Sequence, residues 1–343
     1  MTERTEQPIA ITGVTGFIGR NVARILAAGG QPWRGLVRDR RKLALLGLGG
    51  GEIIDGELAD RPSLARLCSD VSAVIHCGGT IAAFSRQDFS RVNVEGTARL
   101  LDACRTNGVS RFIHVSSIVA REPQLSDYAA SKRESEHVVC QSRGTTDMAC
   151  AIVRPPAVYG PGDEATIPLI RSLTQSYALL PGGPSSRVSL LHVEDLARAL
   201  ASLALDGTLA SGPFEIDDGK KGGYSFAELA SLASAVTGTQ VRVIFLPRSM
   251  LFLPASLSLF LAHVKGSPTV FSPGKLSELY HPNWVADSAL STFSGWKPRI
   301  DFSTGFADTL EWYRKHGWVP EGQAKLGAGQ AGNRGLWGYE RRQ

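Results

Sequence analysis

Short apolar runs alternate with helix-like segments through the first half of this chain, and this alternation most narrows the folds open to it. The apolar runs are nearly continuous, as in strands that are buried on both faces of a parallel sheet. The segments between them have the length and periodicity of crossover helices. The pattern predicts an α/β fold with a doubly wound parallel sheet, whose first six strands fall at 8–12, 33–37, 51–56, 72–77, 111–117 and 148–156.

The first predicted strand runs directly into the glycine-rich stretch TGVTGFIG at residues 12–19. Gly13 permits a sharp turn, Gly16 lets backbone approach a pyrophosphate, and Gly19 lets the next helix pack on the strand. The N–H groups and positive end of that helix, predicted at 18–28, point to the same place. In this position the glycines indicate a Rossmann-type dinucleotide site, and a tight turn without a ligand is the alternative.

The composition of the chain changes beyond Pro155, where glycine and proline become frequent and the alternation of predicted strands and helices becomes less regular. We expect residues 1–155 to form the dinucleotide-binding domain, with 189–217 returning to it. A smaller C-terminal substrate-binding lobe is expected from 156–188 and 218–320, including a helix at 225–238. The glycine-rich, basic segment 321–343 is predicted to be a flexible tail.

The end of the second predicted strand bears on which dinucleotide is bound. NAD-selective sites place an acidic side chain there, against the ribose diol. Here Arg38 stands where the chain leaves the strand, and a guanidinium favours the 2′-phosphate of NADP(H). Asp39 follows at once, so NAD(H) remains open while NADP(H) is favoured.

A tyrosine and a lysine four residues apart, Tyr128 and Lys132, would share one face of a helix. A nearby ammonium stabilises a phenolate, which would make the tyrosine a usable acid or base near neutral pH. Such pairs also occur by chance on helix surfaces. Ser116 and Ser117 end the fifth predicted strand, where ligands of parallel sheets bind, although such hydroxyls also cap turns.

Composition excludes several other classes of protein. The net charge is +5, but no run of Lys and Arg is interleaved with aromatic residues, so nucleic acid is a poor partner. The five cysteines are scattered without a CxxC pair, which argues against disulfides and zinc and suits a reducing cytoplasm. The charged N-terminus is unlike a signal peptide.

One apolar segment, Met250 to Val264, stands out in the second half. It is fifteen residues long and contains Pro254, so it is too short to span a bilayer. We expect a buried helix or a cap over a pocket, with peripheral membrane contact as the alternative.

Together these motifs resemble the extended branch of the short-chain dehydrogenase/reductase superfamily, the NAD-dependent epimerase/dehydratase family. The resemblance reaches about residue 319 and includes HCGG (76–79), VNVEGT (92–97), HVSS, YAASK, RPPAVYGPGD (154–163) and LHVEDLA (191–197). It implies that Tyr128 is the acid/base, that Lys132 binds ribose and lowers the tyrosine pKa, and that Ser117 positions the substrate oxygen. Asn93 matches a position that is often structural. The implied cofactor contacts are Gly13, Thr15, Gly16, Phe17, Ile18, Gly19, Arg38, Glu57, Leu58, Cys77, Gly78, Gly79, Lys132, Pro155 and Val158.

Within the family, Ser117-Ile118-Val119 lacks the acid of the dehydratases, and the setting of Arg187 is similar to the 3β-hydroxysteroid dehydrogenase and dihydroflavonol reductase groups. We therefore expect an NADP(H)-dependent carbonyl reductase or alcohol dehydrogenase for an apolar or ring-bearing substrate. The alternatives are an NAD-dependent sugar-nucleotide epimerase and a non-catalytic dinucleotide sensor. The resemblance also implies a homodimer through the helices near 90–107 and 127–141. The interval from Ser117 to Tyr128 is shorter than in most extended members, which leaves open what covers the substrate.

Overall fold

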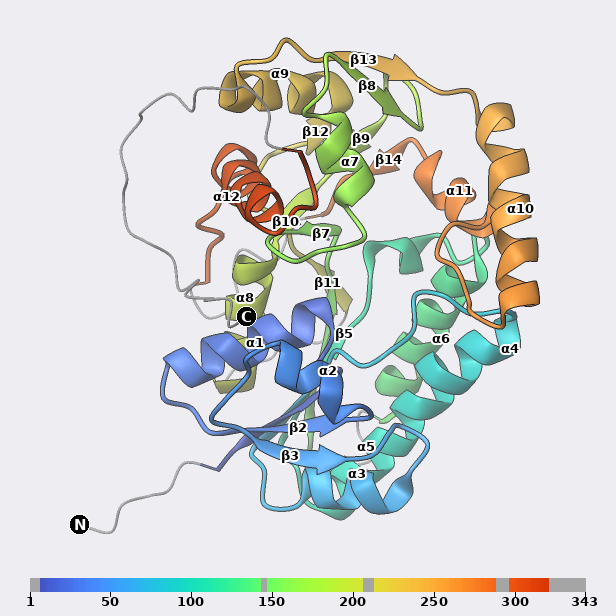
Figure 1. Ribbon diagram of the computed structural model, residues 1–343. Coiled ribbons are helices and arrows are strands. Elements are labelled where there is room, and N and C mark those ends of the chain that lie inside the picture. The colour runs from blue at the N-terminus through green and yellow to red at the C-terminus, as the bar shows by residue number, and fades with distance from the viewer. Residues whose placement is uncertain (1–6, 143–146, 206–212, 288–295, 321–343) are drawn as a thin grey trace.

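The centre of the molecule is a seven-stranded sheet whose strands are all parallel, in the order β11-β6-β5-β4-β1-β2-β3. The structure, a computed structural model, describes residues 7–142, 147–205, 213–287 and 296–320 (Figure 1). The predicted doubly wound α/β fold is confirmed. The strands are β1 (Ile9–Thr12), β2 (Trp33–Val37), β3 (Glu52–Asp55), β4 (Ala73–His76), β5 (Arg111–Val115), β6 (Ala149–Arg154) and β11 (Pro213–Glu215).

Helices cover both faces of the sheet and bury a separate apolar core on each. One core joins alternate strand residues such as Ile11 to α1 (Phe17–Ala28) and α8 (Val193–Leu205). The other joins residues such as Phe112 to α3, α5 and α6. The bounds of the remaining helices of this part are α2 (Arg40–Leu45), α3 (Arg61–Cys68), α4 (Arg86–Phe89), α5 (Gly96–Thr106) and α6 (Asp127–Ser142), with a 3-10 turn at Ile118–Arg121.

The helix predicted at 90–107 is present, and its first turn is π-helical. A π-helical stretch at Ser90–Glu95 precedes α5. Within it Asn93 donates to the Thr80 carbonyl at 3.0 Å and to Ser131 Oγ at 2.9 Å, and it accepts from the Thr80 N–H at 2.8 Å. These bonds tie the loop after β4 to α6, which is the structural role expected for this asparagine.

The C-terminal part adds three small sheets, β10-β7, β12-β9-β14 and β13-β8, around a third apolar core. Between the segments that form this C-terminal part, the chain returns to the large sheet. There α8 packs on α1, and β11 forms the edge strand. The predicted tail, 321–343, lies outside the described residues. The elements are β7 (Ala157–Tyr159), α7 (Ile167–Ser172), β8 (Tyr177–Leu180), β9 (Arg187–Val188), β10 (Leu190–His192), β12 (Tyr224–Ser225), α9 (Phe226–Thr237), β13 (Arg242–Phe245), α10 (Arg248–Lys265), α11 (Pro273–Leu279), β14 (Asn283–Trp284) and α12 (Phe302–Lys315).

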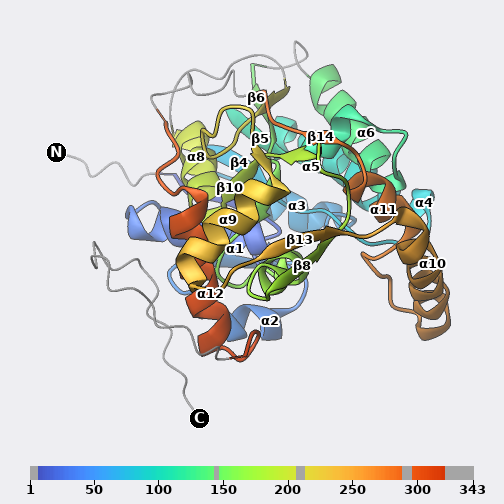
Figure 2. The ribbon, with the colours of Figure 1, turned by 90° about the horizontal axis from the view of Figure 1, so that it is seen from above.

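Helix α10 holds the apolar segment Met250 to Val264, and the expectation that this helix is buried is wrong. Only Ala255 and Ala262 of the helix are buried, and most of its large apolar side chains are exposed. Figure 2 shows α10 projecting from the side of the molecule. None of the helices in the described ranges is long and apolar enough to cross a membrane.

Candidate active site

The predicted site residues gather at one edge of the sheet. Parallel strands end at the same edge, so the loops that follow them meet there. The glycine turn follows β1, and the serine pair follows β5. The other predicted cofactor contacts follow β2 (Arg38), β3 (Glu57, Leu58), β4 (Cys77, Gly78, Gly79) and β6 (Pro155), while Val158 lies in β7.

The glycine turn forms a cradle that side chains would fill. Gly13 has a φ of +70°, and a Cβ there would lie 2.8 Å from the Gly78 nitrogen. A Cβ on Gly19 would lie 2.2 Å from the Gly13 carbonyl oxygen. Helix α1 starts after Gly16 with no side-chain cap and no acid in its first turn, so its first N–H groups have no helical acceptor. This cradle fits a pyrophosphate, and Thr15, Phe17 and Ile18 belong to it.

A buried polar relay behind the cradle joins the turns after β1 and β4. The Thr12 Oγ1 lies 2.6 Å from His76 Nδ1 and accepts from the Gly78 N–H at 3.0 Å. The other ring nitrogen of His76 lies 2.9 Å from Thr97 Oγ1. Burial lowers the pKa of His76 to about 3, with the charge of Lys132 as a smaller cause, so the imidazole is neutral. Our sequence reasoning missed this relay, although Thr12 and His76 end neighbouring strands in register.

In the loop after β2, the carboxylate of Asp39 is engaged in a hydrogen bond, and the side chain of Arg38 is exposed. The Asp39 carboxylate caps α2 by accepting from the Arg41 N–H at 2.9 Å. Arg40 makes a bidentate pair with Asp55, at 2.6 and 2.7 Å. The structure records no hydrogen bond or ion pair for the Arg38 side chain with any described residue.

Ser117 and Tyr128 come together, although ten residues separate them in the sequence. Burial raises the pKa of Tyr128, the charge of Glu278 raises it further, and a hydrogen bond with Ser117 lowers it. The phenol ring packs in an apolar cluster with Ile118 and Trp284. Ser116 is turned away, because its Oγ donates to Glu136 at 2.6 Å inside the protein.

Lys132 is buried one turn along α6 from Tyr128, and its ammonium donates to the Val115 carbonyl at 2.8 Å. Burial lowers the pKa of Lys132 to about 8, while the charge of Glu136 raises it. That this lysine lowers the pKa of Tyr128 stays a prediction; burial and the charge of Glu278 raise that pKa.

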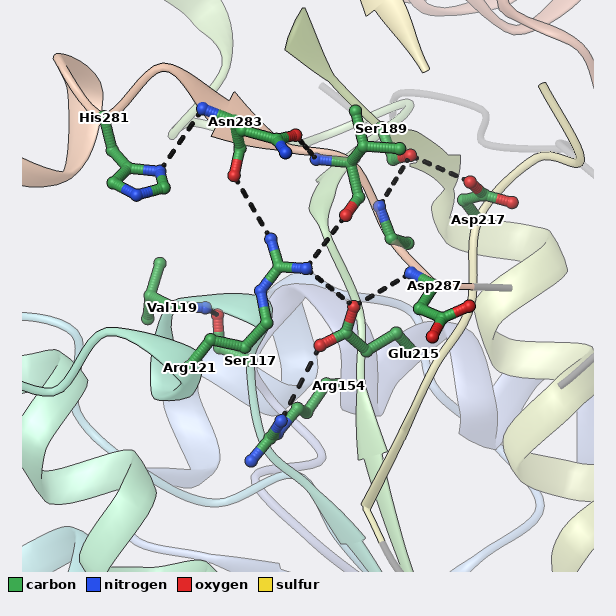
Figure 3. A network of polar contacts seen from close by, with 12 residues as sticks. Ser117, Val119, Arg121, Arg154, Ser189, Glu215, Asp217, His281, Asn283 and Asp287 are labelled. Atoms are coloured by element: carbon green, nitrogen blue, oxygen red, sulfur yellow. Dashed lines mark hydrogen bonds and ion pairs between the residues drawn. The ribbon is translucent and has the colours of Figure 1, made fainter. Parts of the chain in front are cut away.

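The C-terminal lobe covers the short link between Ser117 and Tyr128. Arg121, on this link, donates to the backbone carbonyls of Val285 at 2.9 Å and Asn283 at 3.2 Å (Figure 3). At the other end of the link, Ser126 Oγ donates to the Glu278 carboxylate of α11. The residues around β14 and α11 therefore hold this short link against the C-terminal lobe.

A buried chain of charges connects this cover to the helix of Tyr128. Arg121 pairs with Glu215 at 3.2 Å, and Arg154 lies 3.6 Å from the same carboxylate (Figure 3). Arg154 also makes a bidentate pair with Glu136 of α6, at 2.7 and 2.6 Å. Sequence reasoning missed this chain, because its members come from four distant segments.

Comparisons with known proteins identify the family. Residues 9–211 match the family described as NAD dependent epimerase/dehydratase. A Caulobacter vibrioides protein named ceramide reductase is 37% identical over 319 residues, which cover 91% of this chain and 96% of that protein. This chain belongs to the NAD-dependent epimerase/dehydratase family.

Members of the family are similar to this chain in fold and, in part, in sequence. A Stenotrophomonas maltophilia protein named 2-alkyl-3-oxoalkanoate reductase is 28% identical over 212 residues, 56% of this chain and 63% of that protein. The crystal structure of a Streptomyces venezuelae dTDP-glucose 4,6-dehydratase with NAD bound has a TM-score of 0.67 and 23% identity, over 91% of this chain and 99% of that chain. The latter likeness shows the fold alone.

The family assignment makes this chain an NAD(P)-dependent oxidoreductase with a nicotinamide dinucleotide cofactor. The glycine cradle and the uncapped start of α1 fit the pyrophosphate of that group.

Proposed function

We propose that this protein is an NADP(H)-dependent reductase of carbonyl groups on apolar, long-chain substrates, with Tyr128 as proton donor. The observation that carries the proposal is that Ser117 lies beside Tyr128 at the carboxyl edge of the sheet, with Lys132 buried one helical turn along α6. The name ceramide reductase on a relative that matches over nearly its whole length supports a lipid carbonyl as substrate. The 2-alkyl-3-oxoalkanoate reductase supports the same class.

The residues have separable roles in this reaction. The bound cofactor supplies the hydride chemistry. Tyr128 gives its phenolic proton to the carbonyl oxygen, and Ser117 hydrogen-bonds the same oxygen and holds it near the phenol. Lys132 binds the ribose hydroxyls beside Tyr128. A phenol is protonated at neutral pH, and burial and Glu278 raise the pKa of Tyr128 further, so the tyrosine begins the reduction in its acid form.

The preference for NADP(H) rests on the loop after β2. The carboxylate that would bind a ribose diol, Asp39, is engaged as the cap of α2. Arg38 is exposed with its guanidinium available for a 2′-phosphate. The cofactor contacts named from the sequence complete this proposed site.

Turnover of a defined ketone panel tests the proposal. The panel contains an N-acyl-3-ketosphinganine, a 3-oxo fatty acid ester and UDP-glucose, each with NADPH and with NADH. We expect oxidation of NADPH with the two lipids, and we expect Tyr128→Phe to lower kcat by about 10²-fold or more. Tyr177→Phe, at an exposed tyrosine of β8, is the matched control.

Three other outcomes would contradict the proposal. Epimerisation of UDP-glucose without reduction of any ketone would indicate the epimerase. Cofactor binding with no NADPH oxidation across the panel would indicate a sensor. Full activity of Tyr128→Phe on a confirmed substrate would remove the tyrosine from the chemistry.

A further inference from the structure

Helix α10 carries its large apolar side chains on the outside of the protein. Six of them recur at helical spacing and fall within an arc of about 100° at 3.6 residues per turn. Their side chains are 42% to 75% exposed. We call them the α10 stripe, and its members are Met250, Leu253, Leu257, Phe260, Leu261 and Val264.

The opposite face of α10 attaches the helix to the protein through two alanines and the half-buried Leu251 and Leu259. Ala255 and Ala262 are its buried residues, and Ser258 bonds to Thr269 at 3.2 Å. The ring of His263 lies 5.0 Å from that of Phe84. The stripe is thus the larger apolar face of the helix, and it has no cover among the described residues. A continuous apolar surface of this kind marks a site of interaction.

The charge around the stripe indicates what covers it. The chain from Leu229 to Ser277 contains no aspartate and no glutamate. The same segment contains Arg242, Arg248, Lys265 and Lys275, of which the middle two bound α10. An apolar helical face on a helix without acids, with Arg248 and Lys265 at its two ends, complements an anionic bilayer, where the apolar groups enter the acyl boundary and the cations meet phosphates.

A second copy of the chain fits the stripe less well. Two stripes placed together would bring the cations of both helices side by side with no acid in either segment, and like charges repel. The homodimer expected through α5 and α6 would also use a different surface.

We propose that the α10 stripe docks this protein on the surface of an anionic phospholipid bilayer. The helix lies along the membrane, since it is not long and apolar enough to span one. The stripe runs for about 21 Å at 1.5 Å per residue, which is enough to lie in the headgroup region.

The docked helix lies close to the proposed catalytic tyrosine. Arg248 of α10 donates to Ser277 of α11 at 2.8 Å, and the next residue, Glu278, accepts from Ser126, two residues before Tyr128. Figure 1 shows α11 between α10 and the body of the protein. Delivery of a membrane lipid to this site rests on the proposed function, whereas docking itself does not.

Vesicle flotation with the full chain tests the docking. The vesicles are equal mixtures of phosphatidylglycerol and phosphatidylcholine, compared with pure phosphatidylcholine. We expect the protein to float with the anionic vesicles and to bind the neutral ones less. The variant Leu253→Gln/Leu257→Gln/Phe260→Gln should lose at least about tenfold in partitioning. Leu45→Gln, at a leucine of α2 that is 74% exposed against 75% for Leu253, is the matched control and should bind normally.

The readouts separate docking from turnover. Because the substituted side chains are exposed, the triple variant should keep the wild-type melting temperature and its activity on a short, water-soluble ketone. Failure of the wild type to float, or equal flotation of the triple variant, would overturn the docking whatever the enzyme reduces. A concentration-dependent dimer that the triple variant abolishes, without vesicle binding, would assign the stripe to a second copy instead. Flotation without reduction of any ketone would leave docking intact and refute the proposed reaction.

Discussion

Replacing Lys132 by methionine should stabilise the protein while it destroys turnover. The ammonium of Lys132 is buried, and its pKa is lowered from 10.5 to about 8 mainly by burial. A tenfold change in proton affinity is 1.36 kcal/mol, so keeping this lysine charged in the folded state costs about 3 kcal/mol at neutral pH. Methionine retains the packing of the stem but loses the hydrogen bond to Val115, worth about 1 kcal/mol. We expect Lys132→Met to raise the free energy of unfolding by about 2 kcal/mol near pH 7.

The pH dependence makes this test specific to the lysine. Between the folded pKa of about 8 and the unfolded value of 10.5, the wild type takes up a proton on unfolding, so its stability rises with pH. The gain of the variant should therefore be full below about pH 8 and shrink toward about pH 10. Urea unfolding of both proteins across this range measures the difference, with Lys42→Met at an exposed lysine as the control. A variant that is less stable at neutral pH, or a gain that is flat with pH, would refute the reasoning.

Three further perturbations follow from the site. Arg38→Ala should weaken NADPH binding about tenfold and leave NADH unchanged in fluorescence quenching, and equal effects on both would remove Arg38 from 2′-phosphate recognition. Glu278→Gln removes a charge that raises the pKa of Tyr128, so the alkaline limb of kcat/KM for reduction should move to lower pH, and a shift to higher pH would contradict this. Arg154→Met leaves Glu136 and Glu215 buried without this partner and should lower the free energy of unfolding in urea by about 3–5 kcal/mol, so a loss below 1 kcal/mol would show that the pairs are not both formed.

The fold of the first half could be predicted because a parallel sheet imposes long apolar runs. The six predicted strands all occur, and each end lies within two residues of the predicted position. The small sheets of the C-terminal lobe could not be predicted, since strands of two residues such as β9 carry no periodicity. The π-helical turn at Ser90–Glu95 was also not predicted, because the bonds of Asn93 there go to residues elsewhere in the fold.

The site divides in the same way between local and distant contacts. The glycine turn and the spacing of Tyr128 and Lys132 are local, so the sequence displays them directly. The cover of the site is not local, since Arg121 bonds to Val285 across 164 positions and Ser126 to Glu278 across 152. The spacing of apolar residues along the chain gives no information about contacts between residues so far apart in the sequence. The effect of Glu278 on the pKa of Tyr128 could therefore not be predicted.

Helix α10 shows that apolar spacing alone does not tell which face of a helix is buried. The spacing of its apolar residues identifies a stripe but not the direction in which the stripe points. In α10 the two buried positions hold alanines, Leu251 and Leu259 are half-buried, and the other large apolar side chains are exposed. Full burial of a leucine or phenylalanine side chain stabilises a protein by about 1.5–3 kcal/mol, and an exposed side chain lacks part of this stabilisation. Covering six such side chains on binding would therefore contribute several kcal/mol to the free energy of binding. The exposed part of these side chains is therefore available for binding, and their neighbour α11 contacts the residue that precedes the helix of the proposed acid.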